Sequence, residues 1–260
     1  MNSRRLVQIA SALALNAGAF LQLKWLCPQI MWCHACPASV VACPIGAIGY
    51  YISFALFPIF AVGLLLAIAA LVGRLLCGWV CPFGFLQDLL HKIPIRKFEL
   101  PAWTSKIKYV ILIVTVFGAA AFLGQKSVLY FCRTCPVATF SAIVPKITQG
   151  TFEITSLVQF RLGLLAALIV LCVMVSRAFC RLICPVAALV APFNEIAATA
   201  VRVDGETCVT CGVCRKVCPM GLEPTKLPGG EDSDFTTRSE CINCIECVGK
   251  CPKDSLKLGV

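Results

Sequence analysis

Long apolar segments, separated by short stretches of cysteine, proline and basic residues, dominate the pattern of hydrophobic and polar positions in this chain. The four longest lie at residues 6–26, 45–72, 107–130 and 157–179. A helix of about 20 residues crosses a hydrocarbon core of ~30 Å, so each segment is long enough to be a transmembrane helix. The first is the weakest, because it contains Gln8 and Lys24 and shares its layout with a secretory signal. The pattern therefore predicts an α-helical membrane fold with four transmembrane helices.

Two matched cysteine runs follow the apolar part, within residues 203–260. Each has the spacing C-x2-C-x2-C-x3-C-P, first at Cys208, Cys211, Cys214 and Cys218 and then at Cys241, Cys244, Cys247 and Cys251. This repeated spacing is that of bacterial two-cluster ferredoxins, in which the fourth cysteine of each run binds the other run's [4Fe–4S] cluster. We therefore predict a C-terminal α+β ferredoxin domain. Its cluster 1 is held by Cys208, Cys211, Cys214 and Cys251, and its cluster 2 by Cys241, Cys244, Cys247 and Cys218.

The apolar part contains an internal repeat. The pattern R-x2-C-x3-C-P begins at Arg74 and again at Arg177, and the pattern C-x2-C-P begins at Cys33 and again at Cys132. Because the two patterns occur in the same order, we expect two parallel pseudo-repeats related by an axis along the membrane normal. The expected division is residues 1–98 and 99–202 for the two membrane repeats and 203–260 for the ferredoxin domain.

Four cysteines of the repeat predict an inner membrane cluster. Residues four apart share one face of a helix, so each C-x3-C pair can direct two sulfurs at one site. Two-fold placement then supplies the four thiolates that one [4Fe–4S] cluster needs. The expected ligands of this inner cluster are Cys77, Cys81, Cys180 and Cys184. The competing interpretation is four buried, inert cysteines that serve as small apolar residues.

The same reasoning predicts an outer membrane cluster. Its expected ligands are Cys33, Cys36, Cys132 and Cys135, with Cys27 and Cys43 as alternative ligands. Disulfides remain an alternative for these pairs if the outer side is oxidising. Cys172 has no partner in sequence and is expected to be a packing residue. The expected cofactors are thus four [4Fe–4S] clusters, with iron bound through these cysteines.

Composition and charge support a membrane location. Hydrophobic residues make up 59% of the chain and charged residues 14%, against roughly 25% charged residues in soluble domains. The net charge of +10 does not indicate a nucleic-acid partner, because each bound cluster with its thiolates contributes about −2. Basic residues are concentrated at the N-terminus and in the connection 73–106, whereas the connection 27–44 has none. The positive-inside rule therefore predicts a multi-pass protein of a prokaryotic inner membrane with both termini in the cytoplasm.

Two arginines open the inner motifs of the repeat. Arg74 and Arg177 lie at the ends of apolar segments. Long basic side chains at such positions usually extend toward the interface, so we expect both to snorkel there. A second expected role is to raise the potential of the inner cluster through their positive charge.

These motifs resemble those of the NapH-type membrane ferredoxins, a family that includes MauN-like proteins and the membrane core of the regulator NosR. The resemblance covers most of the chain. It rests on the four apolar segments, the motif R-x2-C-G-W-V-C-P at Arg74, the motif C-R-L-I-C-P-V-A-A at Cys180 and the C-terminal cysteine runs. It implies inner-membrane electron transfer from menaquinol or ubiquinol toward a partner oxidoreductase. The pairs Cys33/Cys36 and Cys132/Cys135 depart from the NapH-type pattern.

The favoured function is an iron–sulfur electron-transfer subunit of a membrane redox complex, rather than a stand-alone enzyme. It would relay electrons between the cytoplasmic ferredoxin domain and the opposite membrane face, because ~30 Å of bilayer is too thick for a single transfer. Partner subunits are expected on the cytoplasmic side and on the outer side, such as a ferredoxin or a multihaem cytochrome. One alternative is quinone binding between the helices, although the apolar segments contain no central Asp, Glu or His. A second is copper binding or reduction at the outer thiolates.

Overall fold

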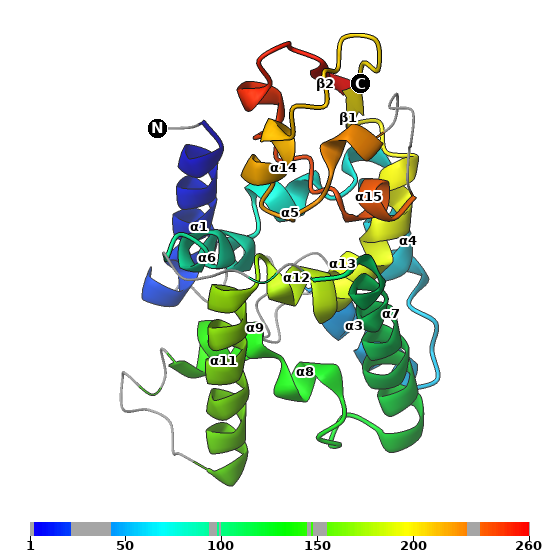
Figure 1. Ribbon diagram of the computed structural model, residues 1–260. Helices are drawn as coiled ribbons and strands as arrows, with labels where there is room; N and C mark the ends of the chain where they lie inside the picture. The colour runs from blue at the N-terminus through cyan, green and yellow to red at the C-terminus, as the bar shows by residue number, and fades with distance from the viewer. Residues whose placement is uncertain are drawn as a thin grey trace.

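The computed structural model describes residues 3–21, 43–93, 98, 100–144, 147, 155–227 and 235–259. These residues form a mostly helical molecule with one small sheet (Figure 1). The predicted cysteines Cys27, Cys33 and Cys36 lie outside the described residues. In Figure 1 the C-terminal part of the chain, in orange and red, lies at one end of the helical part.

The first half of the chain contains α1 (Ser3–Leu21), α3 (Pro44–Ser53), α4 (Ile59–Val72), α5 (Leu75–Trp79), α6 (Pro82–Leu90), η1 (Ala102–Lys106), α7 (Ile107–Ile111) and η2 (Leu112–Leu123). The second half continues with α8 (Phe131–Thr134), α9 (Pro136–Ala138), η3 (Thr139–Ile143), α11 (Ser156–Met174), α12 (Ala178–Leu182), α13 (Pro185–Val190) and η4 (Ala191–Glu195). The C-terminal part contains β1 (Ala200–Val203), α14 (Val213–Val217), η5 (Pro224–Lys226), α15 (Phe235–Glu240), η6 (Val248–Lys250) and β2 (Leu256–Gly259).

Two of the described helical stretches are long and apolar enough to cross a membrane. Trp103–Leu123, which joins η1, α7 and η2, has 21 residues and a mean hydropathy of 1.9, and Ser156–Met174 has 19 residues and a value of 2.3. Most of each stretch faces outward, and the exposed side chains include Ile113, Phe122 and Val170. Such an apolar exterior is stable in lipid but costly in water. Two of the four predicted crossings are therefore present as single helices of sufficient length.

The predicted single helix over residues 45–72 is wrong, because the structure has two helices there. α3 ends at Ser53, α4 begins at Ile59, and the two pack against each other. The break contains Ala55, whose φ is +56°, and Pro58 at the start of α4. Proline has no backbone N–H and disfavours a helical conformation in the residue before it, so the helix cannot continue through this point. The number of membrane crossings stays a prediction.

The C-terminal part is a small α+β unit, which we call the C-terminal domain (residues 200–259). Strands β1 and β2 pair antiparallel, with Val203 opposite Leu256. Because side chains alternate along a strand, Val201 and Val203 both point into one apolar cluster with Leu227, Leu256 and several cysteines. The sheet thus joins the beginning of this domain to its end and encloses its cysteine-rich loops.

The helical part has its own core, in which short helices pack between the long ones. α8 packs on η2, and α9 packs on α11, so both short helices lie between the two long apolar stretches (Figure 1). The core also contains Ile48, Val116, Phe179 and Ala187. The residue directly before each of α3, α6, α9 and α13 is a half-buried or buried cysteine, and each of these helices begins with a proline: the four cysteines are Cys43, Cys81, Cys135 and Cys184.

Candidate metal centres

Two cysteine-lined cavities lie in the C-terminal domain. The first cysteine cavity is lined by Cys208, Cys211, Cys214 and Cys251, and the second cysteine cavity by Cys218, Cys241, Cys244 and Cys247. These groupings are the two crossed sets that the spacing predicts. Both cavities are otherwise bounded mainly by apolar side chains, and each has a volume of about 20 Å³. Thiols around a dry cavity of this kind fit a polynuclear group better than hydrated ions.

A mononuclear metal site does not match these cysteine sets. Among the described residues, no three His, Cys, Asp or Glu side chains lie close enough together to hold one metal ion. Tetrahedral zinc with Zn–S bonds of ~2.3 Å would need sulfurs about 3.8 Å apart. The thiols instead surround a volume, as the ligands of an iron–sulfur cluster do.

The loops around these cavities contain strained backbone. Thr210 (φ +49°), Asn243 (φ +47°) and Ile245 (φ +54°) adopt left-handed conformations, each between two cysteines of a run. A non-glycine residue in this region costs about 1–2 kcal/mol, and a β-branched residue such as Ile245 is rarely found there. These conformations lower the local stability of the loops. They also curve the backbone, so that successive cysteines are directed to one centre.

The inner cysteines, Cys77, Cys81, Cys180 and Cys184, are also brought together. Cys77 lies on α5 and Cys180 on α12, whereas Cys81 and Cys184 immediately precede α6 and α13. The four are close enough that charge on one thiolate acts on the others. Cys81 (φ −64°, ψ 116°) and Cys184 (φ −64°, ψ 112°) share one backbone conformation, so the repeat in sequence is also a local repeat in structure.

The surroundings of Arg74 indicate that the inner cysteines bind a polar group that is larger than a single ion. Its side chain is fully buried, and its charge acts on Cys77 and Cys180. Nη1 donates to Glu240, but Nε and Nη2 have no hydrogen-bond partner among the described residues. A buried guanidinium rarely leaves two donors unsatisfied, because each costs about 1–3 kcal/mol. Thiolates and sulfides of a cluster held by the inner cysteines would accept such hydrogen bonds.

The expectation that Arg74 and Arg177 snorkel is wrong, because both side chains are fully buried. The Arg177 guanidinium donates from Nε and Nη2 to the two carboxylate oxygens of Asp88, at 2.7 Å each, and from Nη1 to the carbonyl of Cys77 at 3.1 Å. A bidentate carboxylate partner inside the protein compensates the charge, so the side chain has no need to reach water.

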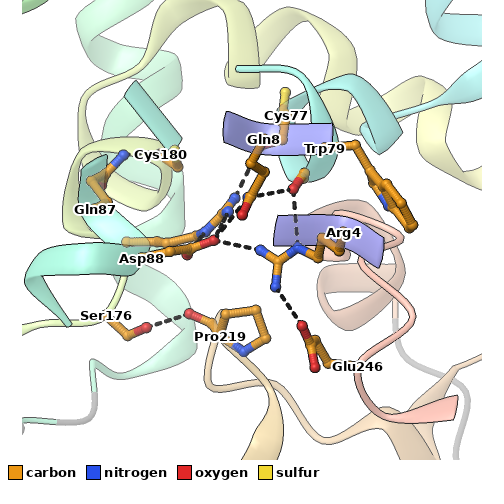
Figure 2. A network of polar contacts seen from close by, with 12 residues as sticks. Arg4, Gln8, Cys77, Trp79, Gln87, Asp88, Ser176, Cys180, Pro219 and Glu246 are labelled. Atoms are coloured by element: carbon orange, nitrogen blue, oxygen red, sulfur yellow. Dashed lines mark hydrogen bonds and ion pairs between the residues drawn. The ribbon is translucent and has the colours of Figure 1, made fainter. Parts of the chain in front are cut away.

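Asp88 is the centre of a network that ties α1 to the C-terminal domain (Figure 2). Arg4 donates to Asp88 at 2.5 Å, to the carbonyl of Gly78 at 3.1 Å and to Glu246 at 3.1 Å. Burial alone would raise the pKa of the Asp88 carboxyl, but hydrogen bonds and charge from Arg177, together with Arg4, hold it below its usual range. Asp88 therefore stays ionised between two guanidinium groups.

A second buried network surrounds Glu240, which directly precedes the predicted ligand Cys241. Its carboxylate accepts from Arg74 at 2.8 Å and from the fully buried Lys108. Burial alone would raise the pKa of Glu240, but the charges of Arg74 and Lys108 hold it below its usual range. This network joins the inner motif, the first long apolar stretch and the C-terminal domain.

The α5 helix and the C-terminal domain are in direct contact. Any side chain at Gly78 would meet the carbonyl oxygen of Ile242, which lies 2.5 Å from the position of a Cβ atom. Trp79 donates from its indole nitrogen to the carbonyl of Asn243 at 3.1 Å. Cys77 packs with Cys218, Cys244 and their apolar neighbours in one cluster. The inner cysteines and the second cysteine cavity are thus adjacent.

Gln87 was not predicted, although it belongs to the inner site. Its amide nitrogen donates to the Cys180 sulfur at 3.2 Å, and its oxygen accepts from the Phe179 N–H at 3.1 Å (Figure 2). Cys172 is buried, as expected of a packing residue, and its thiol also faces the Gln87 oxygen at 3.6 Å. The available signal was the polar pair Gln87-Asp88 in an otherwise apolar helix that follows a Cys-Pro motif.

The outer cysteines that the structure describes meet in a third cysteine cavity. It is lined by Cys43, Cys132 and Cys135, with apolar walls that include Phe131, Phe179 and Pro185. None of these three thiols is in a disulfide. Of the predicted outer ligands, Cys132 and Cys135 are thus placed together, and Cys43, an alternative ligand, joins them.

Comparison with known proteins agrees with this geometry. The family model described as "4Fe-4S binding domain" matches residues 54–101 and again 157–202, and the one described as "4Fe-4S dicluster domain" matches residues 200–252. The first two ranges contain the four inner cysteines, and the third contains the eight cysteines of the C-terminal domain. Cys43, Cys132 and Cys135 lie outside all of the matched ranges.

Several curated proteins are similar to most of this chain. An uncharacterized protein of Methanocaldococcus jannaschii is 30% identical over 194 residues, which are 74% of this chain and 66% of that protein. The ferredoxin-type protein NapH of Escherichia coli is 30% identical over 193 residues, 71% of this chain and 62% of NapH. The regulatory protein NosR of Pseudomonas aeruginosa is 29% identical over 68% of this chain but only 24% of NosR.

No solved structure matches the chain. The chain belongs to the NapH- and NosR-like family of membrane-associated ferredoxin-type proteins, which confirms the predicted resemblance. Its 4Fe-4S domains and its relatives support a role in iron–sulfur electron transport.

Proposed function

We propose that this protein is the iron–sulfur electron-transfer subunit of a membrane redox complex, and that it relays electrons through the membrane between its C-terminal domain and the opposite face. The observation that carries the proposal is the adjacency of its cysteine sites. Cys77 packs against a buried cluster that contains Cys244 of the second cysteine cavity, and Cys218 packs against the same cluster. Pro185, which follows the inner cysteine Cys184, lines the third cysteine cavity.

The [4Fe–4S] clusters would supply one-electron redox chemistry, and the residues of this chain would set their placement and environment. The four sets of cysteines would hold four clusters. Around the inner cysteines, Gln87 donates a hydrogen bond to Cys180, and Arg74 and Arg177 bring buried positive charge. Donors and positive charge stabilise the more negative, reduced form of a cluster, so these residues would raise the potential of the inner centre.

The first cysteine cavity is the expected contact point for a cytoplasmic partner. Cys211 is the exposed cysteine of that set, whereas Cys244 and Cys247 of the second set are buried. Electrons would therefore enter or leave at the loop of Cys211, from a soluble donor or acceptor. On this proposal both termini are cytoplasmic, the protein lies in a prokaryotic inner membrane, and a second partner, such as a ferredoxin or a multihaem cytochrome, docks on the outer side.

Quinone exchange is a second candidate function, favoured by one cavity. A space of about 770 Å³ lies where the helical part meets the C-terminal domain, and its lining includes His91, Ser105, Arg181 and Glu240. These side chains can exchange protons or donate hydrogen bonds, which the reduction of a quinone requires. No observation favours the copper alternative: among the described residues, no group of three or more His, Cys, Asp or Glu side chains could hold one metal ion.

Transfer across proteoliposomes tests the proposal. Protein loaded with iron and sulfide would be inserted into vesicles that contain ferricyanide, and dithionite would be added outside, on the side of the C-terminal domain. We expect the trapped ferricyanide to be reduced without added quinone, and we expect Cys180→Ala to abolish this reduction. Cys172→Ser, a buried cysteine outside the four sets, should keep it. Fully loaded protein that reduces ferricyanide only after a quinone is added, and then faster than protein-free vesicles with the same quinone, would instead support the second candidate.

A further inference from the structure

We propose that Cys43, Cys132 and Cys135 are ligands of a [4Fe–4S] cluster at mid-depth in the helical part, so that Cys43 is a ligand and not an alternative. This inference deepens the proposed function and depends on it for its biological meaning. It assigns a site to residues outside every matched family range. It also changes the predicted location, which was the outer membrane face.

The size and lining of the third cysteine cavity support a cluster. Its volume is about 20 Å³, equal to that of each of the two cavities of the C-terminal domain. Its other walls are the apolar residues Ile45, Phe131, Val137, Phe179, Pro185 and Val186. An apolar cavity with three thiols and no other polar side chain can stabilise a compact, sulfur-ligated group, but not a hydrated ion. The three thiols supply three of the four ligands that a cubane cluster takes.

Backbone conformation supplies a second, independent argument. Cys135 has φ −57° and ψ 120°, close to Cys218 (φ −72°, ψ 115°) and Cys251 (φ −73°, ψ 119°) of the ferredoxin runs. Each of these cysteines precedes a proline, which restricts the residue before it to extended conformations. The dipeptide Cys-Pro therefore presents the Cys135 thiol to the third cavity as it presents the ferredoxin thiols to theirs.

The depth of the site follows from the lengths of the helices. The end of α3 lies beside the end of the first long apolar stretch, because Gln125 donates to Ser53 at 2.7 Å. α3 packs on η2 and has 10 residues, so Cys43 at its start lies about 15 Å back along the helix. The apolar stretch has 21 residues and a length of about 30 Å. Cys43 therefore lies near the middle of that length, and α8 and α9 lie at a similar height (Figure 1).

The neighbouring residues hold this site in place. The Tyr130 hydroxyl forms a hydrogen bond with Cys132. It occupies the space beside Gly49 on α3, where any Cβ atom would lie 2.4 Å from the hydroxyl oxygen. Gly49 therefore allows α3, which follows Cys43, to approach the segment that carries Cys132. Phe179, the residue before the inner ligand Cys180, lines the same cavity, so the mid-depth site is next to the inner one.

This arrangement also changes the correspondence between the two repeats. The spacing matched Cys36 with Cys135, because both begin a C-P pair after a C-x2 pattern. In the structure Cys43 and Cys135 each precede a proline at the first turn of a short helix, α3 and α9. Both short helices are followed by a longer apolar helix that leads to an inner arginine motif, α4 and α11. Cys43 thus occupies the same place before a helix-initiating proline as Cys135, although the backbone of Cys43 (φ −143°, ψ 87°) differs from that of Cys135 (φ −57°, ψ 120°).

Iron and acid-labile sulfide, measured per chain on anaerobically purified protein, test the site. Four cubane clusters give about sixteen irons and three give about twelve, so Cys43→Ala and Cys135→Ala should each lower iron from about sixteen to about twelve. Cys172→Ser is the matched control and should retain the full iron content. EPR signals of the other clusters, unchanged in each variant, would show that the protein is still folded.

Two results of the iron measurement would overturn the assignment: wild-type protein with about twelve irons, or a Cys43→Ala variant with full iron content when Cys33→Ala and Cys36→Ala both lose four irons. Tyr130→Phe keeps the cysteines and should change the Mössbauer parameters of one cluster only; unchanged parameters would also count against the site. Full iron content without transfer across proteoliposomes would refute the proposed function and leave this site standing.

Discussion

Replacing Asp88 by asparagine should loosen the contact between α1, α6 and the C-terminal domain. The substitution keeps the shape of the side chain but removes the negative charge that faces Arg177 and Arg4. The Arg177 side chain is fully buried and that of Asp88 is 18% exposed. Breaking a buried ion pair by removing one partner costs about 3–5 kcal/mol. We take the lower end of this range, because Arg4 keeps Glu246 and Arg177 keeps the Cys77 carbonyl.

Hydrogen exchange of the α1 amides measures this loss. A cost of about 3 kcal/mol corresponds to roughly 10²-fold faster exchange through local opening. Glu223→Gln is the matched control, since Glu223 also pairs with two cations, Arg215 and Lys226, but is 38% exposed. Exposed pairs contribute about 0–1 kcal/mol, so the control should change exchange by a few-fold at most. An Asp88→Asn variant that exchanges no faster than this control would refute the argument that Asp88 compensates two buried guanidinium groups.

Three further predictions follow from the same contacts. The pKa values of Asp88 and Glu240 are lowered, so their ion pairs should be intact above pH ~5 and lost as the pH falls below about 4; protection of the α1 amides, measured relative to the intrinsic exchange rate at each pH, that falls instead toward high pH would contradict this sign. Gln87→Leu removes the donor to Cys180 and should make the inner centre about 40 mV more negative in an EPR redox titration, the equivalent of one net hydrogen bond of ~1 kcal/mol. Gly78→Ala places a methyl group against a carbonyl of the C-terminal domain and should increase limited proteolysis between the two parts, whereas Gly63→Ala, in open space on α4, should not.

Much of the candidate site could be predicted from local spacing. The eight cysteines of the C-terminal domain surround two cavities in the crossed sets that C-x2-C-x2-C-x3-C-P predicts, because short loops allow few ways to direct such cysteines. The C-x3-C-P pairs likewise converge, but not on one helix face as predicted: Cys81 and Cys184 follow the ends of α5 and α12 in extended conformations. Pro58 also indicates the helix break from the sequence. The prediction of one helix over residues 45–72 was based instead on the length of that apolar segment.

The buried charges could not be predicted in the same way. Arg74 meets Glu240 across 166 positions of the chain, and Arg177 meets Asp88 across 89. An arginine at the end of an apolar segment is predicted to snorkel toward the interface unless its carboxylate partner is known. The partner is supplied by the packing of separate elements, which no local pattern records.

The sequence alone determined the class of this protein: an apolar helical part, two ferredoxin runs and a repeated Cys-Pro motif, each of which depends on neighbouring residues. The tertiary structure decided the rest. It grouped Cys43 with Cys132 and Cys135, placed them beside the inner cysteines, and set Arg74 against Glu240 and Lys108. The physical reason is that spacing restricts which cysteines can share a loop, whereas only the packing of distant helices determines which loops share a cavity and which buried charges compensate each other.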